Sequence, residues 1–236
     1  MPSELQTVRQ LRSRWKPHKE RLLAAKSDHP FPIRIHRACS WLSVVENMGE
    51  KPDYDLALIS QWVAFNALYG QWDDQRREPM PDRECWRRFL DRILKLDSDG
   101  HVATVLEGQR RLVMDLLEDE HLSGFFWQEP GPRRAGQSRK AKYDSQTWYI
   151  ERNWTMILDR LLERIYLMRC QLVHGAATHS SKLNRAALHR CSGMLGALLP
   201  AVLVVLIDRG ADEDWGTMCY PPLEQQQSGG LNGRPR

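Results

Sequence analysis

The feature that most constrains the fold is the apolar run Met194–Ile207, which contains no charged residue. A membrane-spanning helix needs about 20 predominantly apolar residues, so this run is too short to cross a bilayer and no membrane partner is expected. Pro200 lies inside it, and a proline removes one backbone donor and bends a helix. We therefore expect a buried, kinked helix. Since 42% of the residues are hydrophobic, the chain can surround that helix with a sizeable core.

Helical spacing of apolar residues recurs through most of the sequence, whereas no segment has the alternation typical of a strand. One expected helix runs from about residue 33 to 48, and Asp53 or Asp55 can cap the next, which Gly70 ends. A polar loop is expected at 71–83. Further helices are expected at Glu84–Leu96, His101–Leu122, Thr147–His174 and about Ser181–Arg209. The pattern predicts an all-α helical bundle.

A polar segment lies on each side of this helical domain, which is expected to cover residues 31–222. Residues 1–30 carry more basic than acidic side chains and a partial apolar stripe, so they are interpreted as a peripheral helix with a solvated basic face. An arm that contacts nucleic acid is the alternative for this segment. Residues 223–236 are rich in Gln, Gly and Pro, a composition typical of a disordered tail.

A third polar segment, residues 128–146, combines Gly, Pro and Ser with a cluster of basic side chains. Its composition predicts a flexible, solvated loop. The alternative is a loop that guides RNA by contacting phosphates. The basic residues that would make these contacts are Arg133, Arg134, Arg139, Lys140 and Lys142.

Overall charge and cysteine usage limit the classes of partner and cofactor. The formal net charge of +4 and the pI of about 8.9 are compatible with an RNA partner. The five cysteines are widely spaced and form no C-x-x-C pair, which argues against a disulfide framework or a zinc site. The N-terminus lacks the apolar core of a signal peptide. We therefore expect a cytoplasmic protein without a metal or another cofactor.

Arg169 and His174 form the candidate catalytic pair, at the end of the apolar helical segment before Gly175. An arginine is always charged and can hold a phosphate, and a histidine can move a proton near neutral pH. On a straight helix the two side chains would point about 140° apart, so joint action needs a distorted helix end or a second subunit. The alternative is structural: Arg169 pairs with a surface carboxylate, and His174 caps the helix.

Three stretches carry a resemblance to a known family: LMRCQLVHGAATHSSKLNR (Leu167–Arg185), LISQWVAFNALYG (Leu58–Gly70) and DWGTMCYPP (Asp214–Pro222). They resemble HEPN domains, specifically the ApeA-like branch. The resemblance implies an up-and-down bundle of four or five helices. The stretch from about residue 71 to 146 would then be an insertion between the second core helix and the helix that bears the motif.

The resemblance also implies a chemistry, because HEPN ribonucleases use an R-x(4–6)-H motif without metal. By this resemblance His174 is the general acid or base for attack of an RNA 2′-OH on the neighbouring phosphorus, and Arg169 binds that phosphate. The products would carry a 2′,3′-cyclic phosphate and a 5′-OH. The family implies a two-fold homodimer that brings two Arg/His pairs into one cleft. It further implies a role in defence or stress response, with an antitoxin or another regulatory protein as a partner.

Two departures from the family pattern motivate a different function. Cys170 stands where family members commonly carry a small polar residue, often Asn, and Ala176 replaces the usual second glycine. The alternative is a non-catalytic HEPN module that binds RNA, a nucleotide or a protein partner. A purely structural helical protein is the third interpretation.

Four further residues are candidate supports for the pair. Asn66 lies on the stripe that core residues share, so it is either a satisfied core amide or, by the resemblance, a neighbour of the Arg/His pair together with Glu46. Asn184 and Arg185 match a recurrent Asn-Arg of the family, and would hold the loop after His174 or contact phosphate. The histidines at 174, 179 and 189 have no nearby carboxylate or thiolate set that would complete a metal site.

Overall fold

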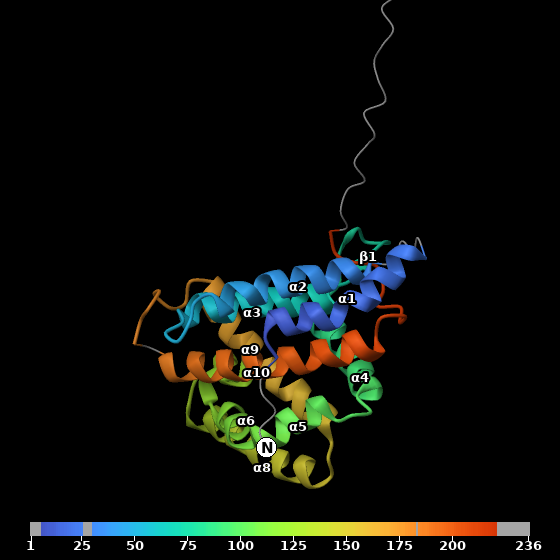
Figure 1. The fold of residues 1–236 in the computed structure, drawn as a ribbon. Helices are drawn as coiled ribbons and strands as arrows, with labels where there is room; N and C mark the ends of the chain where they lie inside the picture. The colour runs from blue at the N-terminus through green and yellow to red at the C-terminus, as the bar shows by residue number, and fades with distance from the viewer. Residues whose placement is uncertain (1–5, 26–29, 183, 221–236) are drawn as a thin grey trace, which may run out of the picture.

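The computed structural model describes residues 6–25, 30–182 and 184–220, and it confirms the all-α prediction (Figure 1). The described residues form ten α-helices, one 3-10 helix and one hairpin of two-residue strands. In chain order these elements are α1 (Val8–Ala24), α2 (Phe31–Glu46), α3 (Tyr54–Tyr69), β1 (Trp72–Asp73), β2 (Glu78–Pro79), α4 (Asp82–Leu96), α5 (His101–Gly108), α6 (Arg110–Glu118), η1 (Glu120–Leu122), α7 (Gly124–Gln128), α8 (Pro132–Ile150), α9 (Trp154–Val173) and α10 (Arg185–Arg209).

Helix α10 runs through the middle of the bundle, between the α1–α2–α3 layer and the layer that contains α5, α6 and α8 (Figure 1). It packs against α1, α3, α4, α5, α6 and α9, which explains why its sequence is apolar on every side. The helix is longer than the apolar run that predicted it, and by length and composition it could cross a membrane. In this structure, however, 78% of its most apolar window is buried inside the bundle.

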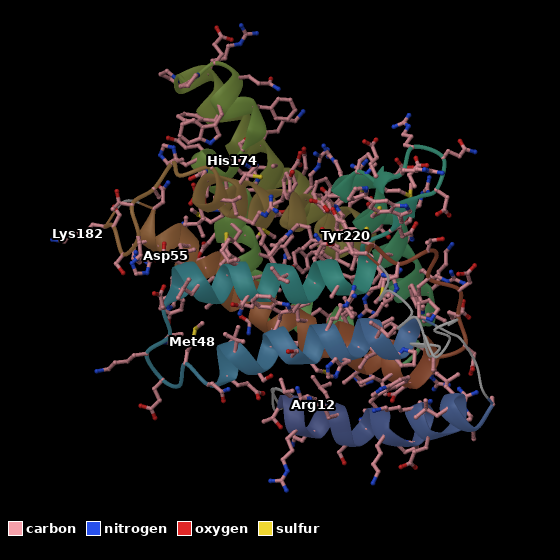
Figure 2. The ribbon with its side chains drawn as sticks, turned by 90° about the horizontal axis from the view of Figure 1, so that it is seen from above. Arg12, Met48, Asp55, His174, Lys182 and Tyr220 are labelled. Carbon is pink, nitrogen blue, oxygen red and sulfur yellow. The ribbon has the colours of Figure 1, made fainter. Side chains whose placement is uncertain are left out.

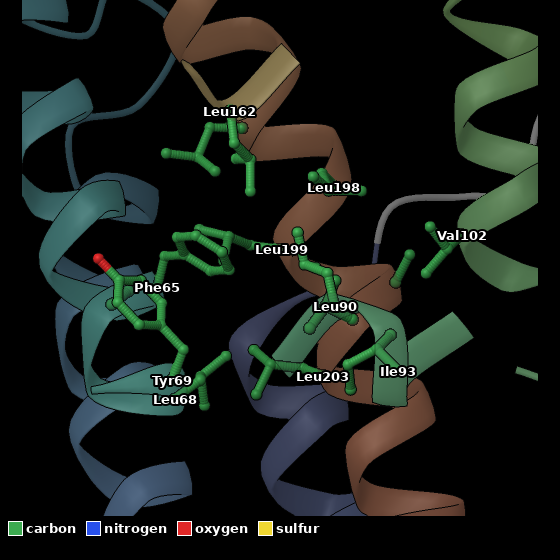
Figure 3. Close-up of a cluster of buried hydrophobic side chains, with 14 of the residues drawn as sticks. Phe65, Leu68, Tyr69, Leu90, Ile93, Val102, Leu162, Leu198, Leu199 and Leu203 are labelled. Atoms are coloured by element: carbon green, nitrogen blue, oxygen red, sulfur yellow. The ribbon is translucent and has the colours of Figure 1, made fainter. Parts of the chain in front are cut away.

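The core is built from leucine, isoleucine and aromatic side chains contributed by both layers. Figure 3 shows one part of it, where Phe65 of α3, Ile93 of α4 and Leu199 of α10 lie together. These three side chains are at most 2% exposed. Burying such a side chain contributes about 1.5–3 kcal/mol relative to leaving it in water, so this shared core holds the two layers together.

Pro200 lies within α10, close to a polar side chain of α3. A proline at this position leaves the carbonyl of Gly196 without its usual helical donor. The amide of Gln61 lies against Gly196, with its Nε2 only 2.9 Å from where a Cβ would stand, and its Oε1 accepts a hydrogen bond from Ser192. A larger residue at 196 would displace the Gln61 amide from this position.

A buried arginine joins α2 to the C-terminal segment. The Arg34 guanidinium is 1% exposed and donates to the carbonyl oxygens of Leu68 (3.0 Å), Gly70 (2.8 Å), Trp215 (3.3 Å) and Gly216 (3.1 Å). Burial lowers the pKa of Arg34 to about 10. The side chain thus fixes the end of α3 against residues 215 and 216, and we call this set of contacts the Arg34 clasp.

Several predicted boundaries were wrong, and local capping explains them. The helix expected from Thr147 is interrupted at Arg152, which has a positive φ of 53°, and α9 begins after Asn153, whose side chain accepts from the Met156 amide. The helix expected at 101–122 is divided at Gln109 and again at Asp119, which caps η1. The segment expected as a loop at 71–83 contains the hairpin of β1 and β2.

The prediction of a flexible loop at 128–146 was also wrong, because most of this segment belongs to α8. Its last proline, Pro132, occupies the first turn of the helix, where a missing amide hydrogen is tolerated. Ser145 is fully buried and its hydroxyl lies 2.9 Å from the Met114 sulfur of α6. Packing on α6 therefore stabilises a helix that local composition does not predict.

The basic N-terminal segment is helical, as predicted, but its basic face is only partly solvated. Within α1, Val8, Leu11 and Trp15 are buried, and the guanidinium of Arg14 forms two hydrogen bonds of 2.6 Å with Asp208 of α10. The predicted tail at 223–236 lies outside the described residues.

Candidate functional site

The site begins with the way α9 ends. His174 is the C-cap residue, and Gly175 follows with a left-handed φ of 69°. The amide of Gly175 donates to the Leu172 carbonyl (3.1 Å), and the amide of Ala176 donates to the Gln171 carbonyl (2.8 Å). This pair of hydrogen bonds defines a Schellman motif. The predicted helix end at His174 and Gly175 is confirmed, and only glycine adopts this conformation without strain.

Arg169 and His174 do not meet within one chain. Arg169 lines a pocket on the α2–α3 side of α9, whereas the side chain of His174 is exposed and does not line that pocket. Figure 2 shows His174 toward the same end of the bundle as Asp55 and Lys182. This separation agrees with the different directions expected from helical geometry.

The surroundings of Arg169 lack an acidic partner among the residues that the structure describes. The guanidinium lies 5.8 Å from the centre of the Tyr166 ring and 3.9 Å from the Cys170 sulfur. The alternative in which Arg169 pairs with a surface carboxylate is thus wrong for the described part of the chain. A permanent cation is left facing an open pocket.

The pocket has a volume of about 470 Å³ and is formed by α2, α3, the hairpin, α9 and the C-terminal segment. Its floor is apolar and includes Trp62. Arg37 stands at the rim and donates to the carbonyls of Cys219 (3.2 Å) and Tyr220 (2.9 Å). Asp82 also lines it and accepts a hydrogen bond from the buried Tyr69 hydroxyl (2.9 Å). A volume of this size is within the range of small-molecule sites.

Asn66 lines the same pocket as Arg169 and is half-buried. The interpretation of Asn66 as a core amide is wrong, because its side chain lies on the pocket wall and no side-chain hydrogen bond to it occurs within the described ranges. Its oxygen would lie 2.7 Å from a Cβ at Gly70, so glycine is needed at that position. The structure thus groups Asn66 with Arg169.

Glu46 does not join this group. Its carboxylate accepts a hydrogen bond of 2.6 Å from the backbone amide of Val8, the first residue of α1. Glu46 therefore satisfies a free amide and complements the positive end of the α1 dipole, which is a structural role. Its expected place beside the Arg/His pair was wrong, since it lines a different hollow, between α1, α2 and α10.

Asn184 and Arg185 hold the loop that follows His174. The Asn184 amide donates to the Gln171 side-chain oxygen (2.9 Å), and the Arg185 guanidinium donates to Asp55 (2.8 Å) and to the Ser181 carbonyl (3.0 Å). Of the two roles predicted for this pair, the structure displays the loop-holding one.

His179 extends the loop contacts to the start of α3. Its Nε2 lies 2.7 Å from Asp53, the N-cap residue of α3. Burial opposes ionisation of Asp53, but hydrogen bonds from His179 and the α3 amides outweigh it and lower the pKa of Asp53. The ligand atoms of Asp53, Asp55 and His179 lie within 4.8 Å of one another, a grouping that could receive a cation. The Arg185 guanidinium on Asp55 opposes that use.

Gln171 is the residue that the sequence analysis missed. Its Nε2 donates to the carbonyl of His121 (2.9 Å), and its Oε1 accepts from Asn184. The same His121 carbonyl also accepts from the Trp127 indole (2.8 Å). Gln171 thus ties the motif to both η1 and α10. No local signal marks it, because its partners are remote in the sequence.

The predicted RNA-binding residues of 128–146 are not equivalent. Arg133 and Lys140 are exposed, whereas Lys142 forms an ion pair of 2.5 Å with Glu118 of α6. The side chains of Arg134 and Arg139 lie outside the described part of the structure.

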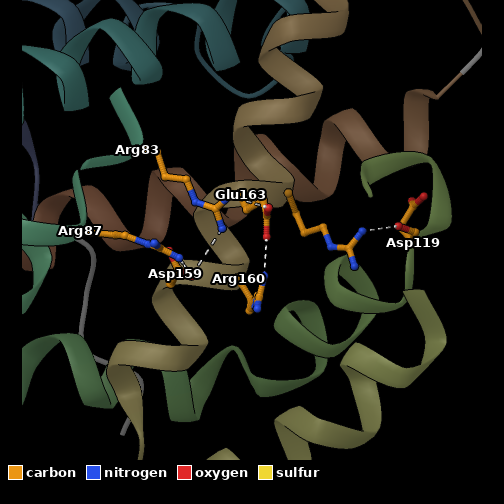
Figure 4. A network of polar contacts seen from close by, with 7 residues as sticks. Arg83, Arg87, Asp119, Asp159, Arg160 and Glu163 are labelled. Atoms are coloured by element: carbon orange, nitrogen blue, oxygen red, sulfur yellow. Dashed lines mark hydrogen bonds and ion pairs between the residues drawn. The ribbon is translucent and has the colours of Figure 1, made fainter. Parts of the chain in front are cut away.

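A second polar cluster, in the middle of α9, supports the helix that carries the motif. Figure 4 shows Arg83 and Arg87 of α4 directed at Asp159, with Glu163 and Arg160 beside them. The Arg87 guanidinium binds both carboxylate oxygens of Asp159, at 2.5 and 2.6 Å. Burial opposes ionisation of Asp159, yet the hydrogen bonds from Arg87 outweigh it and hold the pKa of that carboxyl below its usual value.

The structure therefore brings Arg169 and Asn66 to one pocket and leaves His174 and Gln171 on another face of α9. We call the contacts of Asn184, Arg185 and His179 that hold the loop after His174 the loop clamp. A scan against protein-family models and searches of curated proteins and of solved structures found no match.

Proposed function

We propose that this chain is a metal-independent endoribonuclease of the HEPN type. The observation that carries the proposal is Arg169, a guanidinium that faces an open pocket and has no carboxylate partner in the described ranges. An arginine in this state binds a phosphate through charge-assisted hydrogen bonds. The exposed imidazole of His174, at the end of the same helix, supplies the proton-transfer group.

In the proposed reaction the RNA 2′-oxygen attacks the adjacent phosphorus. The 2′-OH loses its proton to a general base, the bond from phosphorus to the 5′-oxygen breaks, and that oxygen leaves with a proton from a general acid. His174 supplies one of these roles. Arg169 offsets the negative charge that develops on the phosphoryl oxygens. The products carry a 2′,3′-cyclic phosphate and a 5′-OH, so no water is consumed in this step.

The divergence of Arg169 and His174 supports a dimeric site. Since the two side chains lie on different faces of α9, a phosphate held by Arg169 of one subunit would be approached by His174 of another. A two-fold axis would place two Arg/His pairs in one cleft and provide both an acid and a base.

The first experiment is incubation of a labelled, structured RNA with the purified protein in EDTA. Wild-type protein should cleave it and leave cyclic-phosphate ends, whereas Arg169→Ala and His174→Ala should not. Exposed residues of the same type that do not line the pocket, Arg111→Ala and His36→Ala, are the matched controls and should cleave normally. Equal activity of all five proteins would contradict the proposal.

A mixture of the two inactive variants tests whether the site is shared. If subunits combine at random, about half of the dimers contain one chain of each variant, and these retain one intact Arg169 opposite one intact His174. The mixture should therefore regain part of the activity that neither variant has alone, and only part because each mixed dimer holds one imidazole instead of two. A mixture that stays inactive, from proteins that light scattering shows to exchange subunits, would exclude a site shared between chains.

A non-catalytic module that binds RNA or a nucleotide is the second candidate. The position of His174 outside the pocket favours it, because the pocket needs no proton-transfer group to bind a ligand. This candidate predicts no cleavage of any RNA, retained RNA binding in His174→Ala, and weakened binding in Arg169→Ala. Filter binding of the three proteins to the same RNA separates the two candidates.

A further inference from the structure

An exposed aromatic cluster stands beside the end of α9. The side chains of Phe125 and Trp127 are 53% and 50% exposed. Phe126 packs edge-on against Trp127, with ring centres 5.2 Å apart, and against His121, at 5.0 Å. Large aromatic side chains bury much apolar area when they pack, so two exposed ones on the short helix α7 indicate a surface that binds a partner.

Hydrogen bonds connect this aromatic cluster to Gln171, three residues before His174. The carbonyl of His121 accepts from both the Trp127 indole and the Gln171 amide. Gln171 and His174 are three residues apart, so on the helix surface they are neighbours on one face. The aromatic cluster therefore lies on the His174 side of α9 and is held there by Gln171, away from the Arg169 pocket.

The charge around Phe125 is favourable for an anion. Phe125 and Lys140 line one small hollow of about 160 Å³ together with Arg160 and Arg164. Asp144 and Glu163 are the acidic residues that line it. Arg160 pairs with Glu163. In the described part of the chain Lys140 has no ion-pair partner. The hollow is smaller than a typical ligand pocket, and its size suits a phosphate group beside an exposed ring.

We propose that Phe125 and Trp127 form a stacking platform for unpaired bases of an RNA strand, with Lys140 contacting its backbone. Aromatic rings next to basic groups are the means by which proteins bind single-stranded nucleic acid, because every base has a face that can stack. A duplex hides those faces within its own stack. This inference rests on the proposed ribonuclease function and specifies its substrate class. The substrate is RNA that is unpaired next to the cleaved bond.

The test measures RNA affinity rather than cleavage. All variants are made in protein that carries His174→Ala, so that the RNA stays intact. Fluorescence anisotropy then gives the affinity of each protein for a labelled single-stranded oligoribonucleotide and for a blunt duplex of the same sequence. Adding Trp127→Ala or Phe125→Ala should weaken single-strand binding by about tenfold or more, as loss of one stacked base does, and leave duplex binding unchanged.

Two further variants separate stacking from structure. Trp127→Phe keeps the ring but loses the hydrogen bond to His121, and should bind within about twofold of the background protein if stacking is what matters. Ile150→Ala removes an apolar side chain that is 82% exposed on α8, and should have no effect. The Phe125 side chain can form no hydrogen bond, so Phe125→Ala tests the platform even if Trp127→Ala proves unstable.

Three outcomes would overturn the platform: no loss of single-strand affinity, equal loss for single strand and duplex, or a change from dimer to monomer on light scattering. The last would show that the aromatic surface joins two copies of the chain. The wild-type cleavage assay remains an independent result. If wild type cleaves nothing while the platform variants lose single-strand affinity, the ribonuclease proposal fails and the platform stands.

Discussion

The Arg34 clasp and the end of α9 use the same guanidinium group in opposite ways. Arg34 is 1% exposed and is surrounded by four backbone carbonyls, whereas Arg169 faces a pocket and contacts the Tyr166 ring and the Cys170 sulfur. The two terminal nitrogens of the first arginine donate to these carbonyls, and its Nε is buried without an acceptor among the described residues, so the group is closed to any ligand. The second retains most of its donors, so the two arginines differ in the acceptors around them rather than in residue type, and this difference supports the proposed role of Arg169 in binding a phosphate.

The largest effect expected from this comparison is on stability, from Arg34→Ala. The change leaves several buried carbonyls without a donor and opens a cavity, so the free energy of unfolding should fall by at least about 3 kcal/mol. Urea denaturation followed by circular dichroism measures it. Arg37→Ala, which removes two carbonyl contacts from a more exposed position, is the matched control and should lose less than about 1 kcal/mol. Equal losses would show that the clasp has no special role.

A smaller loss of stability is expected from Gln171→Ala, at the end of α9. The variant loses the hydrogen bonds to His121 and Asn184, which are partly exposed, so the free energy of unfolding should fall by about 1–2 kcal/mol. Amide hydrogen exchange should also become faster in residues 174–182. If exchange changes equally across the whole molecule, Gln171 supports the global fold and not this end alone.

Acid titration sharpens the comparison further, because the loop clamp depends on a carboxylate and the clasp does not. The folded-state pKa of Asp53 lies below its ordinary value of about 4, so the ionised carboxylate stabilises the folded protein above about pH 4. This stabilisation is lost as the pH falls through the folded-state pKa. Asp53→Asn keeps an N-cap oxygen for α3, so it should lose little stability at pH 7 and should flatten the loss of stability below about pH 4. An unchanged acid profile would contradict the role of the clamp.

The smallest effect on stability is expected from Arg169→Ala, although it should have the largest effect on activity. Its ring contact is long and partly exposed, so the free energy of unfolding should change by less than about 0.5 kcal/mol. A loss above about 2 kcal/mol, measured by the same urea titration, would mean that Arg169 is a structural residue like Arg34.

Sequence reasoning was most accurate where a feature depends on neighbouring residues. The cap at Asp53, the end of α9 at Gly175 and the burial of α10 all follow from local chemistry or from apolar spacing, and all are confirmed. It failed where packing outweighs composition. Helix α8 is rich in polar residues, yet Ser145 and its neighbours pack on α6, and this contact cannot be read from the segment itself.

The candidate site was predicted in part for the same reason. The roles of Arg169 and His174, proposed from their type, their setting and the family resemblance, stay predictions, whereas Arg185 proved to hold the following loop. Glu46 was misplaced and Gln171 was missed, because a hydrogen-bond partner 38 or 50 residues away leaves no local pattern. The spacing of two residues in the sequence shows whether they share a face of a helix. It does not show which pocket each face of the helix lines.

The Arg34 clasp has a consequence for the order in which the protein is made. Arg34 leaves the ribosome long before Trp215 and Gly216, its partners 181 and 182 residues later in the chain. Until those carbonyls emerge, the guanidinium has only half of its acceptors and stays hydrated. Closing so long a loop is a late step in folding, so the clasp is completed only after synthesis has passed α10. In a chain that stalls before this point, the end of α3 is not covered by residues 215 and 216. Chaperones and proteases can detect this exposed surface.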